Sequence, residues 1–187
     1  MARLLMIVGA ATPPGRLAAA IAFAAGTVAD AAVDVLNLAD TPVEICDGRP
    51  LDQYDESTRA AVGKIADAAA VLIAAPVYRA SYPGVLKNLL DTTPVEALQA
   101  KPVGIVAMGG SPHHFLGVDW QLREVLTWFG ALVAPASVYI TGGDFKDGQL
   151  ASESARSDLA ALVQTLLILS RLERGSLGPK PLAAKFT

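Results

Sequence analysis

The segment Pro76-Val77-Tyr78-Arg79-Ala80-Ser81 brings a phenol ring, a guanidinium and a hydroxyl together in one short stretch. It follows the apolar run Ala68–Ala75, which reads as a buried strand that Pro76 ends. A helical pattern opens at Ser81, with Pro83 near its first turn. Since open α/β sheets bind ligands at the carboxyl ends of their strands, these side chains predict a ligand-binding edge.

A second turn, Gly109-Gly110-Ser111, follows the apolar stretch Val103–Met108 and would lie at the same edge. Two successive glycines allow the backbone to come close to a ligand. Two such turns side by side predict a flat ligand bound by its edge. The turn lacks the G-x-S-x-G pattern of a hydrolase elbow, so Ser111 is not predicted to be a nucleophile.

The third candidate is the loop Gly9–Arg16, between the first predicted strand and the first predicted helix. It lacks the G-x-G-x-x-G spacing of dinucleotide-binding folds and the G-x-x-x-x-G-K-[ST] of P-loops. It does hold a hydroxyl at Thr12, a cation at Arg16 and a helix N-terminus, where N–H groups and the helix dipole favour an anion. A phosphate site and a plain loop with a solvated arginine both fit this pattern.

Strand and helix patterns alternate along the whole chain, which predicts a doubly wound parallel sheet. Its length fits the flavodoxin-like strand order 2-1-3-4-5, with a phosphate group expected at the first turn. Ser57 is the expected N-cap of the second helix, and Gly130 is expected to close the fourth. The expected strands are Arg3–Val8, Val33–Leu38, Val71–Ala75, Val103–Met108 and Val133–Ile140, and the expected helices are Ala18–Ala29, Ser57–Ala68, the one from Ser81, His114–Gly130 and Leu150–Arg174.

Length and composition predict one domain over residues 1–174, followed by a tail, 175–187, that is mobile or pairs with another subunit. A net charge of -3 and scattered cations argue against nucleic acid as a partner. Cys46 is the single cysteine, so no internal disulfide can form, which fits a cytoplasmic protein. The apolar stretch Leu17–Ala29 is interrupted and too short for a membrane span, which needs about 20 residues.

Together these motifs resemble the NADPH-dependent FMN reductase family, from about Arg3 to about Asp144. The branch that is most similar comprises the small reductases that supply reduced FMN to alkanesulfonate monooxygenases. The resemblance rests on the segment from Pro76 through Asp91 and on Gly109-Gly110-Ser111, with His114 and Asp119 beyond at matching spacing. It implies a flavodoxin-like fold with FMN and NADPH or NADH as cofactors.

The resemblance also implies a role for each site residue. The family usually has Ser or Thr where this chain has Ala10, Gly15 and Leu17, which predicts weaker flavin binding or a flavin that comes and goes as a substrate. The implied positions are Thr12 and Arg16, with the backbone of Ala10 and Ala11, for the FMN phosphate; Pro76, Val77, Tyr78, Arg79, Ala80 and Ser81 for the ribityl chain and one edge of the isoalloxazine; and Gly109, Gly110 and Ser111 for N–H groups to its pyrimidine end.

The implied activity is an NAD(P)H:FMN oxidoreductase whose reduced flavin serves a partner oxygenase. Hydride would pass from the nicotinamide to flavin N5, so no catalytic acid or base is assigned on the protein. One alternative is a flavin-bound quinone or azo-compound reductase. Another is a non-enzymatic electron carrier, for which the acidic loop Ala39–Asp55 would dock a basic partner.

Two further features are read from spacing. His113 and His114 are adjacent, so they cannot share a metal ion well on a helix, and no metal site is predicted. Lys87 and Asp91 lie four residues apart on one predicted helix, which predicts a surface ion pair or a subunit contact. With Leu86, Leu89 and Leu90 read as apolar surface beside that pair, and with the family resemblance, we expect a homodimer or homotetramer through this helix.

Overall fold

A computed structural model describes residues 3–12 and 15–172 of the chain. The predicted tail 175–187 lies outside this part. The strands are β1 (Arg3–Val8), β2 (Ala32–Asn37), β3 (Ala70–Pro76), β4 (Pro102–Gly109), β5 (Leu132–Val133), β6 (Val138–Thr141), β7 (Phe145–Lys146) and β8 (Gln149–Leu150). The helices are α1 (Arg16–Gly26), α2 (Glu56–Asp67), α3 (Gly84–Thr92), α4 (Val95–Leu98), α5 (Leu116–Trp128) and α6 (Glu153–Leu169), with short 3-10 turns η1 (Leu51–Gln53), η2 (Pro112–His114) and η3 (Gly142–Asp144).

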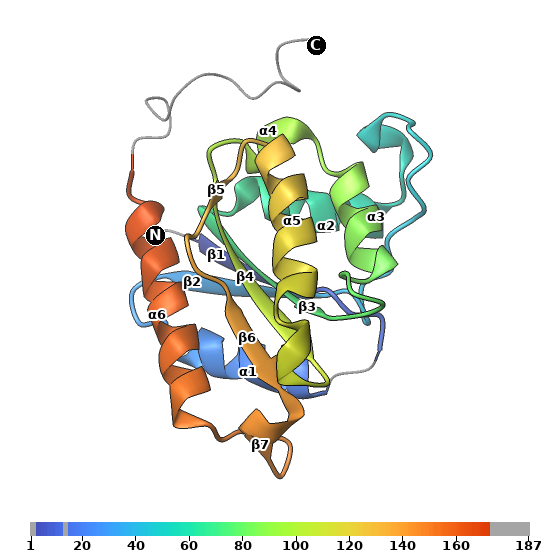
Figure 1. Cartoon of the computed structure of the whole chain (residues 1–187). Coiled ribbons are helices and arrows are strands. Elements are labelled where there is room, and N and C mark those ends of the chain that lie inside the picture. Colours follow the sequence, from blue (N-terminus) through green and yellow to red (C-terminus); the bar gives the residue numbers. More distant parts are fainter. Residues whose placement is uncertain (1–2, 13–14, 173–187) are drawn as a thin grey trace.

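The main sheet is parallel throughout and has the order β2-β1-β3-β4-β5, which confirms the predicted doubly wound arrangement. Helices α1 and α6 pack on one face of the sheet, and α2, α3, α4 and α5 pack on the other (Figure 1). β1, β3 and β4 are buried almost continuously, as expected for central strands that are covered on both faces. Their apolar runs therefore set the position of the binding edge.

The fifth strand differs from the prediction, because it is broken in two. β5 pairs with the start of β4, and β6 pairs with its end. The predicted continuous strand Val133–Ile140 contains Pro135, which has no N–H to donate to the ladder. Since this position is an edge of the sheet, the interruption leaves the strand order unchanged.

Two helix ends test the predicted capping residues. The N-cap of α2 is Asp55 and not Ser57: the Asp55 carboxylate accepts the Thr58 N–H at 2.7 Å. The closing role of Gly130 is confirmed, since it has a φ of 68° just past α5. The Gly130 N–H donates to the Thr127 carbonyl and the next N–H to that of Leu126, which is a Schellman ending.

Three predicted helices begin later than expected, and one of them is α5, which starts at Leu116 and not at His114. α3 starts at Gly84 and not at Ser81, because Tyr78 to Ser81 form a separate turn. The last helix starts at Glu153, capped by the Ser152 hydroxyl, while Leu150 belongs to the unpredicted hairpin β7–β8.

The prediction of an apolar surface on α3 is wrong. Leu86, Leu89 and Leu90 are buried in the core, at 1% exposure or less. Lys87 and Asp91 do form the expected surface pair, at 2.5 Å between Nζ and Oδ1. The exposed apolar groups nearby come from α5, where Trp120 and Trp128 are 65% and 57% exposed. Within residues 3–12 and 15–172, no helix is long and apolar enough to cross a membrane.

Candidate functional site

The three segments singled out in the sequence meet at one edge of the sheet. β1, β3 and β4 are neighbours and parallel, with Val8 paired to Ala74 and Pro76 paired to Met108. The loop after β1, the segment 76–81 after β3 and the turn after β4 therefore leave the sheet side by side. This is the edge at which open α/β sheets bind ligands.

A cavity of about 220 Å³, the first-turn cavity, lies between the loop after β1 and the end of β3. Arg16 is exposed beside it and pairs with no carboxylate among the described residues. α1 has no side-chain cap at Gly15 and no acidic residue in its first turn. An uncompensated guanidinium and a free helix N-terminus favour an anion here. The cavity is lined by the predicted residues Ala10, Thr12, Arg16, Pro76 and Tyr78, together with Val8, Gly15, Leu17, Ala18 and Met108.

A second cavity, of about 530 Å³, lies on the other side of the same segment, and we call it the second-turn cavity. It combines a guanidinium, two imidazoles and glycine backbone, so it offers one cation and several hydrogen-bonding groups. Its lining is Val77, Arg79, Ala80 and Gly110 from the predicted set, with His113, His114 and Gly117 added by the structure. The two cavities flank the turn that follows β3.

That turn is held in an unfavourable backbone conformation. Tyr78 and Ser81 exchange backbone hydrogen bonds at 2.7 and 3.0 Å, and the two residues between them have positive φ, 50° at Arg79 and 62° at Ala80. Glycine is the residue that adopts this conformation without cost, whereas other residues lose roughly 1–2 kcal/mol each. Strain of this kind persists where the surrounding structure enforces it, and it is concentrated at functional sites.

The groups that hold the turn come from α5. The Ser81 hydroxyl donates to Gln121 Oε1, and Gln121 Nε2 donates to the Ala80 carbonyl at 3.3 Å. Gly117 lets the helix approach, since a Cβ there would lie 3.1 Å from the Ala80 oxygen. Sequence patterns did not predict Gln121 or Gly117, because both lie far along the chain from the turn and no local signal links them to it.

The two adjacent glycines after β4 have different environments. A Cβ on Gly109 would lie 1.8 Å from the Tyr139 hydroxyl oxygen, whereas a Cβ on Gly110 would meet no atom within 4 Å. The Tyr139 hydroxyl donates to the Ser111 carbonyl at 2.6 Å, and burial raises the pKa of this phenol. Gly109 therefore makes room for Tyr139, and only Gly110 leaves open space toward the cavity.

The predicted residues thus divide into those that reach a cavity and those that do not. Ala11 lines a third cleft, together with Thr12 and Tyr78. The Ser81 hydroxyl, Gly109 and the Ser111 carbonyl are occupied by contacts within the protein.

The acidic loop 39–55 has much of its charge engaged internally. Glu44 pairs with Arg49 at 3.0 Å and accepts the Asp55 N–H at 2.7 Å. The Arg49 N–H and then the Tyr54 hydroxyl hold the pKa of Asp47 below its usual value. Asp55 caps α2. These carboxylates stabilise the loop itself, which weakens the case for a surface that docks a basic partner.

Comparison with known proteins agrees with this arrangement. Residues 2–146 match the sequence profile of a family described as NADPH-dependent FMN reductase. An NAD(P)H-dependent FAD/FMN reductase of Geobacillus thermodenitrificans is 36% identical over 131 residues, which cover 70% of this chain and 71% of that protein. The apo crystal structure of an NADH:FMN oxidoreductase, EMOB, is 26% identical and covers 97% of this chain and 92% of its own, with a TM-score of 0.69.

A flavodoxin from the domain Archaea has the same fold, with a TM-score of 0.64, 12% identity and coverage of 91% of this chain and 99% of that one. The residues at the strand ends fit FMN, since the first-turn cavity offers a helix N-terminus and the guanidinium of Arg16, which no carboxylate of residues 3–12 and 15–172 pairs with. The family match spans well over half of the chain. The chain therefore belongs to the NADPH-dependent FMN reductase family, as an oxidoreductase that uses FMN and a nicotinamide nucleotide.

Proposed function

We propose that this edge reduces FMN with NAD(P)H, by hydride transfer to flavin N5, and that the reduced flavin leaves to supply a partner oxygenase. The observation that carries the proposal is the pair of cavities on either side of the strained turn. One has Arg16 and the α1 N-terminus, and the other has Arg79 and two histidines. An anionic cofactor and an anionic nucleotide can then both bind at one sheet edge.

Each group of residues has a distinct task in this proposal. Thr12 and Arg16, with the N–H groups of Ala10 and Ala11, hold the FMN phosphate. The segment Pro76–Ser81 lines the ribityl chain and one edge of the ring. The N–H groups of Gly109, Gly110 and Ser111 face the pyrimidine end, where negative charge is stabilised by donors. When bound, FMN supplies the two-electron chemistry, and the protein supplies proximity and orientation.

The first-turn cavity also favours flavin that exchanges. Ala10 and Leu17, where the family usually has hydroxyls, are buried apolar residues. Fewer hydroxyl donors weaken the grip on the phosphate, because each charge-assisted hydrogen bond contributes roughly 1.5–3 kcal/mol. Weak binding suits a flavin that is a substrate and is passed on.

The decisive experiment is steady-state NAD(P)H oxidation by well-dialysed protein, with and without added FMN. We expect oxidation that depends on FMN, and FMN bound in preference to riboflavin. Equal affinity for riboflavin and FMN would exclude the phosphate assignment. The absence of FMN-dependent oxidation with either nucleotide would leave the electron-carrier alternative in its place.

Gly110→Val tests the second-turn cavity. Because a Cβ at Gly110 meets no atom within 4 Å, the variant should fold with little change in melting temperature. Its bulk would crowd the flavin edge, so NAD(P)H oxidation at saturating FMN should fall. Gly109→Ala is the contrasting variant: it should lower the melting temperature, because its Cβ collides with Tyr139. Full turnover in Gly110→Val would remove this turn from the site.

We also propose that the chain assembles as a closed homodimer or homotetramer through α3 and the neighbouring part of α5. The face combines the Lys87–Asp91 pair with half-exposed Trp128. A cavity of about 430 Å³ lies between these residues and Glu124. A symmetric interface sets this mixed surface against itself. Light scattering at micromolar concentration should give a multiple of the chain mass, and Trp128→Glu should lower it; a monomer mass for the wild type would refute the proposal.

A further inference from the structure

The turn after β6 leaves the sheet at the same edge as the three segments that form the binding site. β6 is parallel to β4, and its last residue, Thr141, pairs with Gly109 at the end of β4. The 3-10 turn η3 follows directly, and the hairpin β7–β8 comes after it. Because ligands bind at the carboxyl ends of the strands in such a sheet, η3 is a fourth segment at the binding edge. It has no role in the function proposed above.

Gly142, the first residue of η3, lies against the guanidinium of Arg16. A Cβ on Gly142 would be 2.8 Å from Arg16 Nη1 and 3.8 Å from Arg16 Cζ. Non-bonded heavy atoms pack at about 3.5–4.0 Å, so a side chain at this position would displace the guanidinium. Outside residues 138–146, no other residue of 3–12 and 15–172 has an atom within 4 Å of that Cβ. The missing side chain therefore makes room for Arg16.

The next residue, Gly143, has a different environment. A Cβ on Gly143 would be 3.6 Å from Thr141 Oγ1, an ordinary van der Waals contact, and the residue is exposed. The φ angles of both glycines lie outside the positive range that favours glycine, so a residue with a side chain can adopt either backbone. Space for a guanidinium, rather than backbone conformation, is what distinguishes position 142 from position 143.

η3 is fixed by hydrogen bonds at both of its ends. Asp144 Oδ2 accepts the Thr141 N–H at 2.7 Å and the Thr141 hydroxyl at 3.1 Å, which closes the turn. The Asp144 carbonyl accepts the N–H groups of Ala151 and Ser152 at 2.8 and 3.0 Å, which ties the turn to the N-terminus of α6. Gly142 is therefore part of a preformed surface, and a ligand need not order it.

The same turn is also fixed relative to α1, the helix that begins at Arg16. The hairpin β7–β8 lies beside α1 (Figure 1), and Leu150 of β8 is buried in the same apolar cluster as Leu17 of α1. The Asp144 carboxylate accepts from Thr141, and Arg16 pairs with no carboxylate in the described part of the chain. Packing on Gly142 thus holds the guanidinium without neutralising its charge.

We propose that Gly142 positions Arg16 for the FMN phosphate and thereby contributes to the preference of this edge for FMN over riboflavin; the phosphate contact rests on the function proposed above. Gly142 is a positioning residue, because its task is to contact Arg16 and not the ligand. A guanidinium that is already placed beside the first-turn cavity loses less conformational freedom when an anion binds. A larger residue at position 142 would move only the end of a long side chain. It would therefore cost the fold little while it moves the positive charge from its place beside the cavity.

The test compares Gly142→Val with Gly143→Val, because valine has its bulk at Cβ and the two variants differ by one position. FMN and riboflavin are each titrated by the quenching of flavin fluorescence, without NAD(P)H. Gly142→Val should lower FMN affinity roughly fivefold or more, since a charge-assisted contact is weakened, and should change riboflavin affinity by less than about twofold. Gly143→Val should change both affinities by less than about twofold. Equal losses for FMN and riboflavin in Gly142→Val, or an unchanged FMN affinity, would overturn the proposal.

Melting curves show whether the variants are folded. Gly142→Val should melt close to the wild type, because its Cβ contacts the movable end of the Arg16 side chain. If it melts well below the wild type, Gly142→Ala takes its place in the titrations. That variant adds a single methyl group and should lower FMN affinity about threefold, again without an equal loss for riboflavin.

A double variant tests whether position 142 acts through Arg16. Once Arg16→Ala has removed the guanidinium, Gly142→Val has no side chain to displace. It should then lower FMN affinity by less than about twofold in that background, because the two changes act on one contact. If the two losses add in full, position 142 acts by another route and the proposal fails.

These measurements also separate the role of Gly142 from the function proposed above. If Arg16→Ala weakens FMN binding and Gly142→Val does not, the positioning role fails and the phosphate site stands. If neither variant weakens FMN binding, the phosphate assignment fails, and the role of Gly142 fails with it. If the wild type binds FMN but does not reduce it with NAD(P)H, the reductase function fails, while the titrations still decide the role of Gly142.

Discussion

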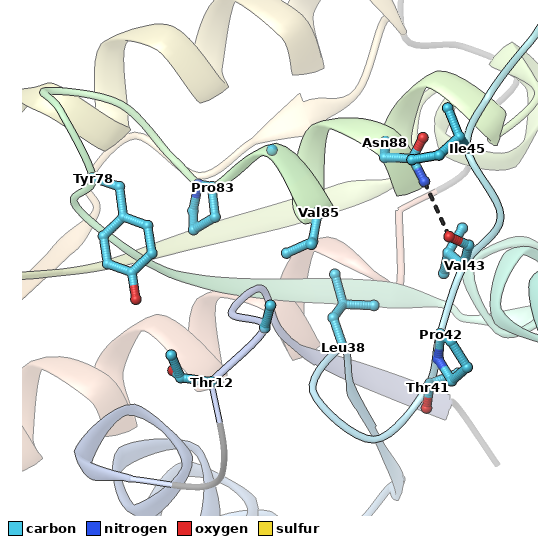
Figure 2. Close-up of a pocket in the computed structure, with 12 residues that line it drawn as sticks. Thr12, Leu38, Thr41, Pro42, Val43, Ile45, Tyr78, Pro83, Val85 and Asn88 are labelled. Carbon is cyan, nitrogen blue, oxygen red and sulfur yellow. Dashed lines mark hydrogen bonds between the residues drawn. The ribbon is translucent and has the colours of Figure 1, made fainter.

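The loop 39–55 and the turn Tyr78–Ser81 both line the third cleft, of about 650 Å³ (Figure 2), and the protein holds them in opposite ways. The loop is long and rich in carboxylates, yet side chains of α2 and α3 fasten it at several points. The turn is short, exposed and strained, with Gln121 as its main support from outside. The loop is therefore held by hydrogen bonds to its neighbours, whereas the turn carries backbone strain, which is concentrated at functional sites.

The comparison predicts that changes on the ligand side alter binding and that changes in the loop alter stability. Arg16→Ala should show the largest effect on the ligand side, a loss of FMN affinity on the order of tenfold or more, since a charge-assisted contact contributes roughly 1.5–3 kcal/mol. The melting temperature should stay the same, because Arg16 is exposed and pairs with no carboxylate among the described residues. Arg171→Ala, an exposed arginine after α6, is the control in the same titration; unchanged affinity in Arg16→Ala would mean a solvated side chain.

Changes in the loop should instead lower the stability of the protein. Asn88→Ala removes two hydrogen bonds of 2.8 Å and leaves the Cys46 N–H and the Glu44 carbonyl without that partner. We expect the free energy of unfolding to fall by about 2 kcal/mol in urea titrations. Gln164→Ala, on the exposed side of α6, should change it by less than about 0.5 kcal/mol. Equal stability of the two variants would show that the loop is not fastened through Asn88.

These two regions also show what the sequence can predict. The strand order followed from apolar runs such as Arg3–Val8, where burial is encoded locally, and the strand-end rule placed the three turns at one edge. The wall of the third cleft depends on a hydrogen bond between Asn88 and Cys46, 42 residues away, and the turn depends on Gln121, 40 residues from Ser81. Neither hydrogen bond is reflected in the periodicity or composition of the sequence, so neither could be predicted from it.

The strain in the turn can be relieved by one substitution. Ala80→Gly removes the unfavourable contact of a Cβ at φ 62°, and the gain of about 1–2 kcal/mol exceeds the added entropy of the unfolded chain, roughly 0.4–1 kcal/mol. The free energy of unfolding should therefore rise by about 0.5–1 kcal/mol in urea titrations. Ala136→Gly, in an exposed loop position without positive φ, should lower it instead. A similar loss in both variants would mean that the turn stores no strain.

The smallest expected effect is the pH dependence at the end of the loop, where Asp55 caps α2. Hydrogen bonding to the Thr58 side chain, and then to the Thr58 N–H, lowers the pKa of Asp55 below its ordinary value of 3.8. The folded state therefore binds this proton less readily than the unfolded state does, so the cap contributes fully above pH 3.8 and is lost as the pH falls through the lower, folded value. Asp55→Asn keeps an oxygen acceptor that does not titrate, so its melting temperature should match the wild type near neutral pH and fall less steeply below pH 3.8. Melting curves of the two proteins measured over that range would give parallel pH profiles if the carboxylate of Asp55 were merely solvated, and the loop would then lose one of the contacts that distinguish it from the strained turn.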